Sequence, residues 1–152
     1  MLSPVPKSER PGAPSFMPVG RRCWWGTKIK AMEIFKEFSI EAAHWLPHVP
    51  EGHKCRRLHG HSFHIVIHVS GPVDSQLGWV VDFGDVKAAF KTIEDQIDHR
   101  CLNEVAGLEN PTSENLARWL WVRLRPQLPA LSKVVVKETC TSGCIYSGEL
   151  DG

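Results

Sequence analysis

Two long segments alternate between apolar and polar residues, and this alternation most limits how the chain can fold. In residues 32–44, MEIFKEFSIEAAH, the even-numbered positions from Ile34 to His44 are apolar or histidine, with Lys36 as the exception. Residues 59–71, HGHSFHIVIHVSG, alternate in the same way on their odd-numbered positions. Successive side chains of a strand point to opposite faces of a sheet. Both segments are therefore predicted to be half-buried strands.

Two helices and a hairpin are predicted after these strands. Asp82 can cap a helix that runs toward Asp98, and a second helix is predicted to begin near Pro111–Glu114 and to stop before Pro126. Their apolar stripes are Phe83, Val86, Phe90, Ile93 and Ile97 in the first, and Leu116, Trp119, Leu120 and Leu124 in the second. The final KVVVKET and CIYSG segments, joined by a TSG turn, predict a hairpin. The order ββααββ predicts an α+β domain with both helices on one face of the sheet.

Length and composition limit the class of protein. A chain of 152 residues with 42% apolar residues is long enough for one domain with a core, and short for two. Its 18 basic and 17 acidic residues give a formal charge of +1, so no overall field directs it to nucleic acid or to an anionic membrane. No apolar run approaches the roughly 20 residues that a membrane-spanning helix needs. Five cysteines without a secretory signal favour free thiols in a reducing cytoplasm.

Residues 1–31 differ in composition from the rest of the chain. They contain five prolines and six lysines or arginines, with Glu9 as the only acid. Such a stretch buries too little apolar surface to order itself. A targeting peptide is an alternative, but the prolines oppose the amphipathic helix that such a peptide needs. We therefore expect a disordered leader, or a start assigned too far upstream, followed by one domain at 32–150.

Histidines on the two predicted strands suggest a metal site. His59 and His61 are two residues apart, so their side chains can lie about 7 Å apart on one face of a strand. Two imidazoles leave a tetrahedral zinc ion two ligands short, and His44 at the end of a paired antiparallel strand can supply a third. Three protein ligands and an open position are typical of catalytic zinc. The alternative is a set of exposed strand histidines without a metal.

Cys55 lies four residues before His59 and allows two interpretations. As a fourth ligand it would close the zinc site and make that site structural. As a thiolate beside the metal, favoured by the ion and by Arg56 or Arg57, it would act as a base or nucleophile. The spacing alone does not decide between them.

Two carboxylates complete the candidate residues. Asp98 precedes His99 at the end of the first predicted helix, where a carboxylate can orient an imidazole and raise its basicity; a polar pair at a helix end is the alternative. Glu138 shares a strand face with Val134 and Val136, so it is expected to be buried and to need hydrogen-bond donors. The guanidinium-like edge of a ligand would supply such donors, whereas a salt bridge within the strand is the alternative.

These residues lie in stretches that together resemble one enzyme family. The stretches are EAAHWLPHVPEGHKCRRLHGHSF, the DH pair at 98–99, GLENPTSE and VKETCTSGCIY. They resemble the 6-pyruvoyltetrahydropterin synthases, and most of all the bacterial branch, the 6-carboxytetrahydropterin synthases of queuosine biosynthesis. The similarity spans Met32 to about Glu149. It implies the tunnelling fold (T-fold), a four-stranded antiparallel sheet with two helices, in which trimers close a barrel and two trimers stack into a homohexamer with sites between subunits.

The resemblance implies a catalytic zinc ion. Its ligands would be His44, His59 and His61, and its open position would take the side-chain hydroxyls of the substrate. Cys55 would then be the general base and not a ligand. Zinc would act as a Lewis acid while the thiolate moves protons between the substrate side chain and the ring.

The remaining candidates take supporting roles under the same resemblance. Asp98 and His99 would relay protons. Glu138 would hold the amino-pyrimidine edge of a pterin, assisted by Thr112 and Ser113 at the start of the second helix. A zinc-bearing pterin-binding or purine-binding module without catalysis is the alternative, but it would have no use for a thiol and a proton relay.

The implied reaction converts 7,8-dihydroneopterin triphosphate to 6-carboxy-5,6,7,8-tetrahydropterin, acetaldehyde and triphosphate. Family members that make the 6-pyruvoyl product have a longer link between the cysteine and the HGH sequence. Here three residues, Arg56 to Leu58, separate Cys55 from His59. The short link favours the 6-carboxy product, and the 6-pyruvoyl product is the alternative.

Overall fold

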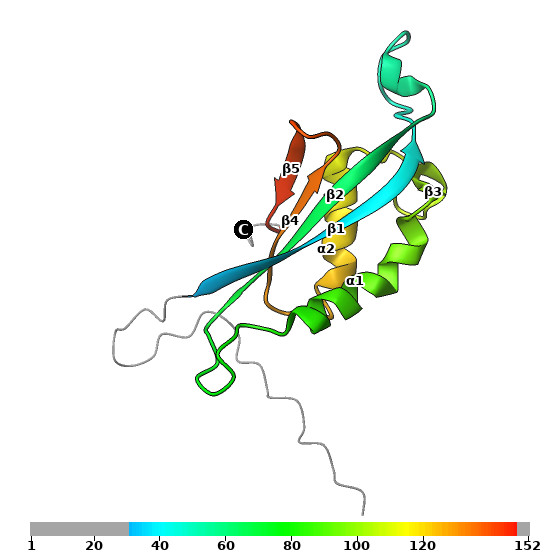
Figure 1. Ribbon diagram of the computed structural model, residues 1–152. Helices are drawn as coiled ribbons and strands as arrows, with labels where there is room; N and C mark the ends of the chain where they lie inside the picture. The colour runs from blue at the N-terminus through cyan, green and yellow to red at the C-terminus, as the bar shows by residue number, and fades with distance from the viewer. Residues whose placement is uncertain (1–30, 149–152) are drawn as a thin grey trace, which may run out of the picture.

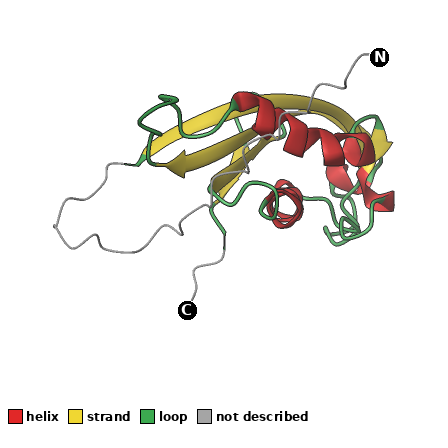
Figure 2. Ribbon diagram, turned by 90° about the horizontal axis from the view of Figure 1, so that it is seen from below, coloured by secondary structure: helices red, strands yellow, loops and turns green. Residues whose placement is uncertain are grey.

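The computed structural model describes residues 31–148, which form a twisted sheet with two helices on one face (Figures 1 and 2). Apart from Ala31, the predicted leader at 1–31 therefore lies outside the described residues. The strands are β1 (Met32–His44), β2 (His59–Gly71), β3 (Arg100–Cys101), β4 (Leu131–Lys137) and β5 (Gly143–Tyr146). The helices are α1 (Phe83–Ile97) and α2 (Ser113–Leu124), with the short 3-10 helices η1 (Lys54–Arg56) and η2 (Leu102–Glu104).

The two alternating segments form the longest strand pair, as predicted. β1 and β2 run antiparallel from Met32 opposite Gly71 to His44 opposite His59. On its other side β2 pairs with β4, and β4 and β5 form the predicted terminal hairpin. Because His44 ends β1 where His59 begins β2, this register brings the histidine-bearing ends of both strands together.

The sheet has one strand more than predicted. β3 adds a fifth strand at the edge of β1 and runs parallel to it, at Ala42 and Ala43. A backbone hydrogen bond fixes this edge, because the N–H of His99 donates to the carbonyl oxygen of Glu41 at 2.6 Å. A strand of two residues carries no alternating pattern, so the sequence could not reveal it. The prediction of four antiparallel strands is wrong at this edge, whereas the α+β class and the order of the longer elements are confirmed.

The first helix begins at its predicted cap, and the second begins within the predicted stretch at 111–114. Asp82 Oδ1 accepts a hydrogen bond from the N–H of Gly84 at 2.7 Å, and Thr112 caps α2 in the same manner. Buried side chains recur at helical spacing: Val86, Ala89, Phe90, Ile93 and Ile97 in α1, and Leu116, Ala117, Trp119, Leu120 and Leu124 in α2. Phe83, predicted in the α1 stripe, is instead exposed on the first turn, where Lys36 Nζ lies 5.9 Å from its ring. Neither described helix is long and apolar enough to cross a lipid bilayer.

The apolar core between the sheet and the helices lies next to the three histidines. Phe63 and Ile65 of β2 are fully buried on the face that the helices cover. His61 and His59 come before Phe63 on the same face of β2, and the side chain of His44 is as buried as the core, at 1% exposed. The ring of Phe63 meets the rings of His44 and His61 edge-on. The apolar core therefore supports one side of a polar group at this end of the sheet.

Candidate metal centre

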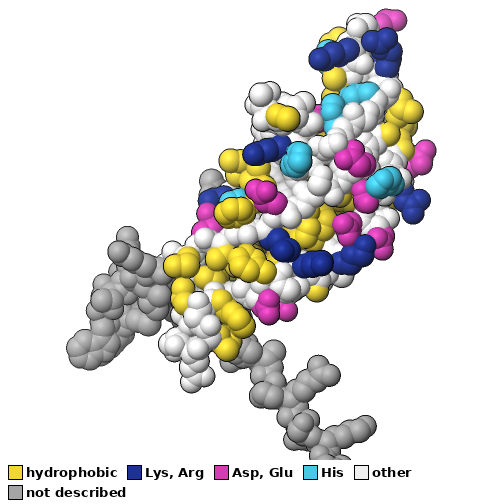
Figure 3. Space-filling view, viewed as in Figure 1, with side chains coloured by type: hydrophobic (Ala, Val, Ile, Leu, Met, Phe, Trp, Pro, Cys, Tyr) yellow, Lys and Arg dark blue, Asp and Glu magenta, His cyan; other side chains and the backbone are white. Residues whose placement is uncertain are grey.

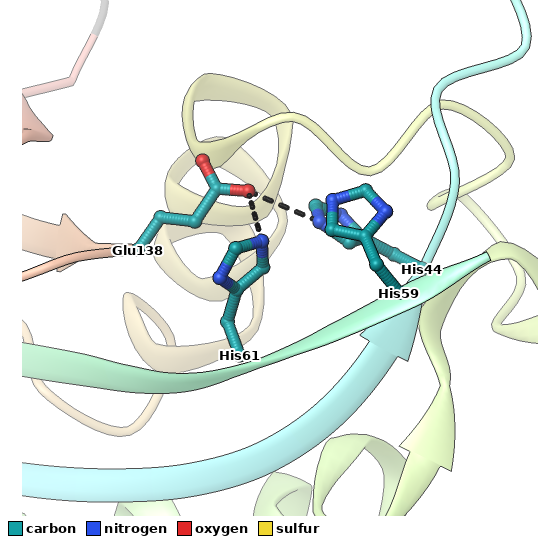
Figure 4. A group of neighbouring side chains, drawn as sticks. All are labelled: His44, His59, His61 and Glu138. Atoms are coloured by element: carbon teal, nitrogen blue, oxygen red, sulfur yellow. Dashed lines mark ion pairs between the residues drawn. The ribbon is translucent and has the colours of Figure 1, made fainter. Parts of the chain in front are cut away.

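Three histidines and a glutamate converge at the end of the sheet (Figure 4). His44 ends β1, His59 and His61 open β2, and Glu138 directly follows β4. One potential ligand atom from each of the four side chains lies within 4.8 Å of all the others. The strand register explains this convergence, because His59 lies opposite His44 and His61 is the next residue on the same face.

Backbone carbonyls orient two of the imidazoles. His44 Nδ1 lies 2.9 Å from the carbonyl oxygen of Pro111, and His59 Nδ1 lies 2.7 Å from that of Arg57. A carbonyl oxygen can only accept a hydrogen bond, so each Nδ1 carries the proton and donates it. In the neutral ring the lone pair is then on Nε2, the arrangement that metal-binding histidines use.

The contacts of the Glu138 carboxylate with two imidazoles indicate a positive charge between these side chains. Its Oε1 lies 3.0 Å from His44 Nε2 and 3.2 Å from His61 Nε2. His44 Nε2 is buried and makes no hydrogen bond of acceptable geometry. A neutral Nε2 lone pair that faces a carboxylate oxygen is repelled by it, unless a proton or a metal ion lies between them. This buried, unsatisfied nitrogen is therefore the observation that best fits a bound cation.

The shifted pKa values of His61 and Glu138 also favour metal binding. Burial lowers the pKa of His61, which favours the neutral imidazole that binds metal ions. With a proton between Nε2 and Oε1, the His44 imidazole lowers the pKa of Glu138 and keeps this carboxyl group ionised, and a metal ion in that place would act in the same direction. Neutral imidazole nitrogens and a carboxylate oxygen are all ligands that zinc accepts. The residues present thus fit the predicted ion, with Glu138 as an additional neighbour that the sequence did not place there.

Cys55 lies beside this group and not within it. The half-buried thiol lines a hollow together with His59, His61 and Glu138, whereas the converging group contains only the three histidines and Glu138 among residues 31–148. The side chain of His53 caps this segment, since its Nδ1 accepts a hydrogen bond from the N–H of Cys55 at 3.1 Å. A thiol next to the candidate ligands can exchange protons with a bound molecule without holding the ion.

Asp98 and His99 form the predicted carboxylate–imidazole pair, but away from Cys55. Asp98 Oδ2 lies 3.0 Å from His99 Nδ1, and its Oδ1 accepts the N–H of Glu41 at 2.9 Å. That backbone hydrogen bond lowers the pKa of Asp98. His99 has a φ of 54°, and its side chain is 77% exposed in a second hollow lined by Glu41 and Ser62. Within one chain, His99 and the thiol of Cys55 therefore line different hollows, although His61 lines both.

Residues at the start of α2 make hydrogen bonds with Glu138 and His44. Ser113 Oγ donates a hydrogen bond to Glu138 Oε2 at 3.2 Å, so the hydroxyl fixes the carboxylate that faces the histidines. Thr112 caps the helix with its own hydroxyl, and Pro111 supplies the carbonyl that orients His44. The sequence did not predict the parts played by the carbonyls of Pro111 and Arg57, because every residue has a carbonyl and its use leaves no sequence signal.

Comparison with known proteins agrees with this geometry. The family model described as 6-pyruvoyl tetrahydropterin synthase matches residues 33–149. A 6-carboxy-5,6,7,8-tetrahydropterin synthase of Synechocystis is 47% identical over 119 residues, which cover 74% of this chain and 91% of that protein. A dihydroneopterin monophosphate aldolase of Pyrococcus furiosus is 35% identical over 101 residues, which cover 66% and 81%.

A solved structure shows the same architecture. The 6-pyruvoyl tetrahydropterin synthase of Caenorhabditis elegans superposes with a TM-score of 0.73 at 25% sequence identity, over 81% of this chain and 99% of that one. The sheet with two helices on one face is therefore the T-fold that the sequence predicted. From the matched residues and the shared fold, the chain belongs to the 6-pyruvoyl tetrahydropterin synthase family.

Proposed function

We propose that this protein is a zinc-dependent carbon–carbon lyase of the 7-deazaguanine and queuosine pathway. Its substrates would be 7,8-dihydroneopterin triphosphate and water, and its products 6-carboxy-5,6,7,8-tetrahydropterin, acetaldehyde and triphosphate. The observation that carries the proposal is the convergence of His44, His59, His61 and Glu138 next to the thiol of Cys55. The 47% identity to a synthase named for this product supports the choice of reaction.

His44, His59 and His61 would hold the zinc ion through their Nε2 atoms. The carbonyl contacts at Nδ1 support this assignment, because they leave Nε2 free to coordinate. A bound zinc ion would supply Lewis acidity to the hydroxyl groups of the substrate side chain and make the adjacent C–H bonds more acidic. With three protein ligands, one position remains for the substrate.

Cys55 would act as the general base that removes a proton from the substrate side chain. Its place in the same hollow as His59 and His61 supports this role. Asp98 would orient His99, which returns or relays protons. Because His99 lines a different hollow from Cys55 in the same chain, we assign the pair to the site of a neighbouring subunit. This arrangement requires an oligomer, which we propose to be a homohexamer of two stacked trimers in the cytoplasm.

Glu138 would bind the amino-pyrimidine edge of the pterin, with Thr112 and Ser113 beside it. The half-buried carboxylate is ionised and is held by the Ser113 hydroxyl, so it can accept two hydrogen bonds from a guanidinium-like edge once it turns from the histidines. A cation bound to the histidine Nε2 atoms would replace the contacts that these nitrogens now make with Glu138 Oε1.

The product should be 6-carboxytetrahydropterin, because only three residues, Arg56 to Leu58, link Cys55 to His59. A short link sets the position of the thiol relative to the substrate side chain that the metal would hold, and under this proposal that position decides which bond breaks.

The test is mass spectrometry of the pterin formed from dihydroneopterin triphosphate, together with an acetaldehyde assay on the same reaction. We expect equal amounts of the carboxy product and acetaldehyde. A pyruvoyl pterin without a two-carbon fragment would assign the enzyme to the other branch, and binding without turnover would support a non-catalytic module.

A further inference from the structure

The hollow beside the candidate metal centre extends onto a basic segment. Lys54 and Arg57 line it together with Cys55, His59 and His61. Three of the four residues at 54–57 are cationic, and the single acid of the segment 45–58, Glu51, does not line the hollow. Figure 3 shows lysine and arginine side chains at the tip of the molecule that η1 forms, next to histidine side chains.

Within residues 31–148, only one of these three cations has a partner. Arg56 Nη1 donates a hydrogen bond to the carbonyl oxygen of Val49 at 3.2 Å. Lys54 and Arg57 are exposed, and their side chains make no ion pair or hydrogen bond with any residue between 31 and 148. The one acid that lines the hollow, Glu138, already faces His44 and His61. Two uncompensated positive charges therefore remain at the edge of the site.

We propose that Lys54 and Arg57 bind the phosphate chain of the substrate and thereby determine how many phosphates the enzyme prefers. A guanidinium group binds phosphate oxygens through two parallel hydrogen bonds, and an ammonium group adds a compact charge. Lys54 begins η1 and Arg57 directly follows it, whereas Glu138 directly follows β4, so pterin and phosphates would contact different segments of one hollow. This inference rests on the proposed function, since it assigns the phosphorylated end of the same substrate.

Relatives in this family make the number of phosphates on the preferred substrate a useful property to test. A relative that is 35% identical is named a dihydroneopterin monophosphate aldolase, so its named substrate carries one phosphate. In a site with two unpaired cations, a triphosphate gains more electrostatic attraction than a monophosphate, and salt weakens that attraction because the cations are exposed.

The test is equilibrium binding to the full-length, zinc-loaded Cys55→Ala protein, which would bind substrate without turning it over. The ligands are 7,8-dihydroneopterin triphosphate, its monophosphate and phosphate-free 7,8-dihydroneopterin. Arg57→Gln should weaken triphosphate binding about tenfold, and the Lys54→Gln/Arg57→Gln double variant about a hundredfold, because each charged hydrogen bond lost is worth about that factor. Binding of the phosphate-free pterin should change less than about twofold, and the salt dependence of triphosphate binding should flatten.

Arg56→Gln is the matched control, since it removes the same charge from the neighbouring residue whose guanidinium is bound to Val49. It should weaken triphosphate binding clearly less than Arg57→Gln does. Equal losses for the triphosphate and the phosphate-free pterin, or no loss in the double variant, would overturn the assignment. If Cys55→Ala binds in the expected pattern while the unsubstituted protein forms another product, the phosphate site would be supported and the proposed reaction refuted. A protein that binds none of the three pterins would overturn both.

Discussion

Replacing His59 and His61 together by alanine is expected to remove the zinc and with it the lyase activity. The double variant leaves His44 as the only imidazole in the group, together with Glu138. A single histidine and a carboxylate do not form the three-ligand site that catalytic zinc requires. Zinc content, measured by inductively coupled plasma mass spectrometry, should fall from about one ion per chain to nearly none.

The same strand offers a control for this variant. His64 lies on β2 with its side chain on the opposite, exposed face. His64→Ala should keep the zinc and the activity, because its imidazole belongs to no part of the converging group. Full zinc occupancy in the His59→Ala/His61→Ala protein would contradict the metal assignment, whatever the activity of that protein.

Cys55→Ala should keep the fold and the zinc but lose turnover. The thiol lines the hollow without joining the four converging side chains, so its removal leaves all proposed ligands in place. Loss of a general base typically costs roughly 10²- to 10⁴-fold in rate, and we expect kcat to fall by that amount. The measurements are kcat for acetaldehyde release, zinc content and the circular dichroism spectrum.

Cys140→Ala is the control for the loss of a thiol. Cys140 is an exposed free thiol in the turn between β4 and β5, so its removal should change neither kcat nor zinc content. If Cys55→Ala lost zinc together with activity, the thiol would be a ligand, and the site would resemble a closed structural one.

The long elements of the fold could be predicted because their burial pattern repeats. In β1 and β2 the alternation marked the buried face correctly, and that face now carries Phe63 and Ile65 in the core. β3 has only two residues and is fixed by backbone hydrogen bonds to β1, which no pattern of side chains records. Phe83 fitted the helical spacing but lies on the first turn of α1, where its side chain is exposed. Periodicity thus predicts the middle of an element better than its ends.

The candidate site was predictable where it depended on strand parity and on the pairing of β1 with β2, and not where it depended on β4 or on the edge strand β3. Parity placed His59 and His61 on one face, and the antiparallel register then brought His44 opposite His59. Glu138 was expected on the buried face, but its contact with two imidazoles follows from how β4 pairs with β2, which the sequence does not specify. The sequence also did not place His99 in a hollow different from that of Cys55, because the short edge strand β3 that follows His99 carries no alternating pattern.

The most direct test of the zinc-dependent lyase is a metal titration of the reaction itself. Protein freed of metal with a chelator is titrated with zinc, and 6-carboxytetrahydropterin and acetaldehyde are quantified at each step from dihydroneopterin triphosphate. We expect no turnover without metal, then a linear rise of both products that levels off at about one zinc per chain. Undiminished turnover by the metal-free protein would contradict the account.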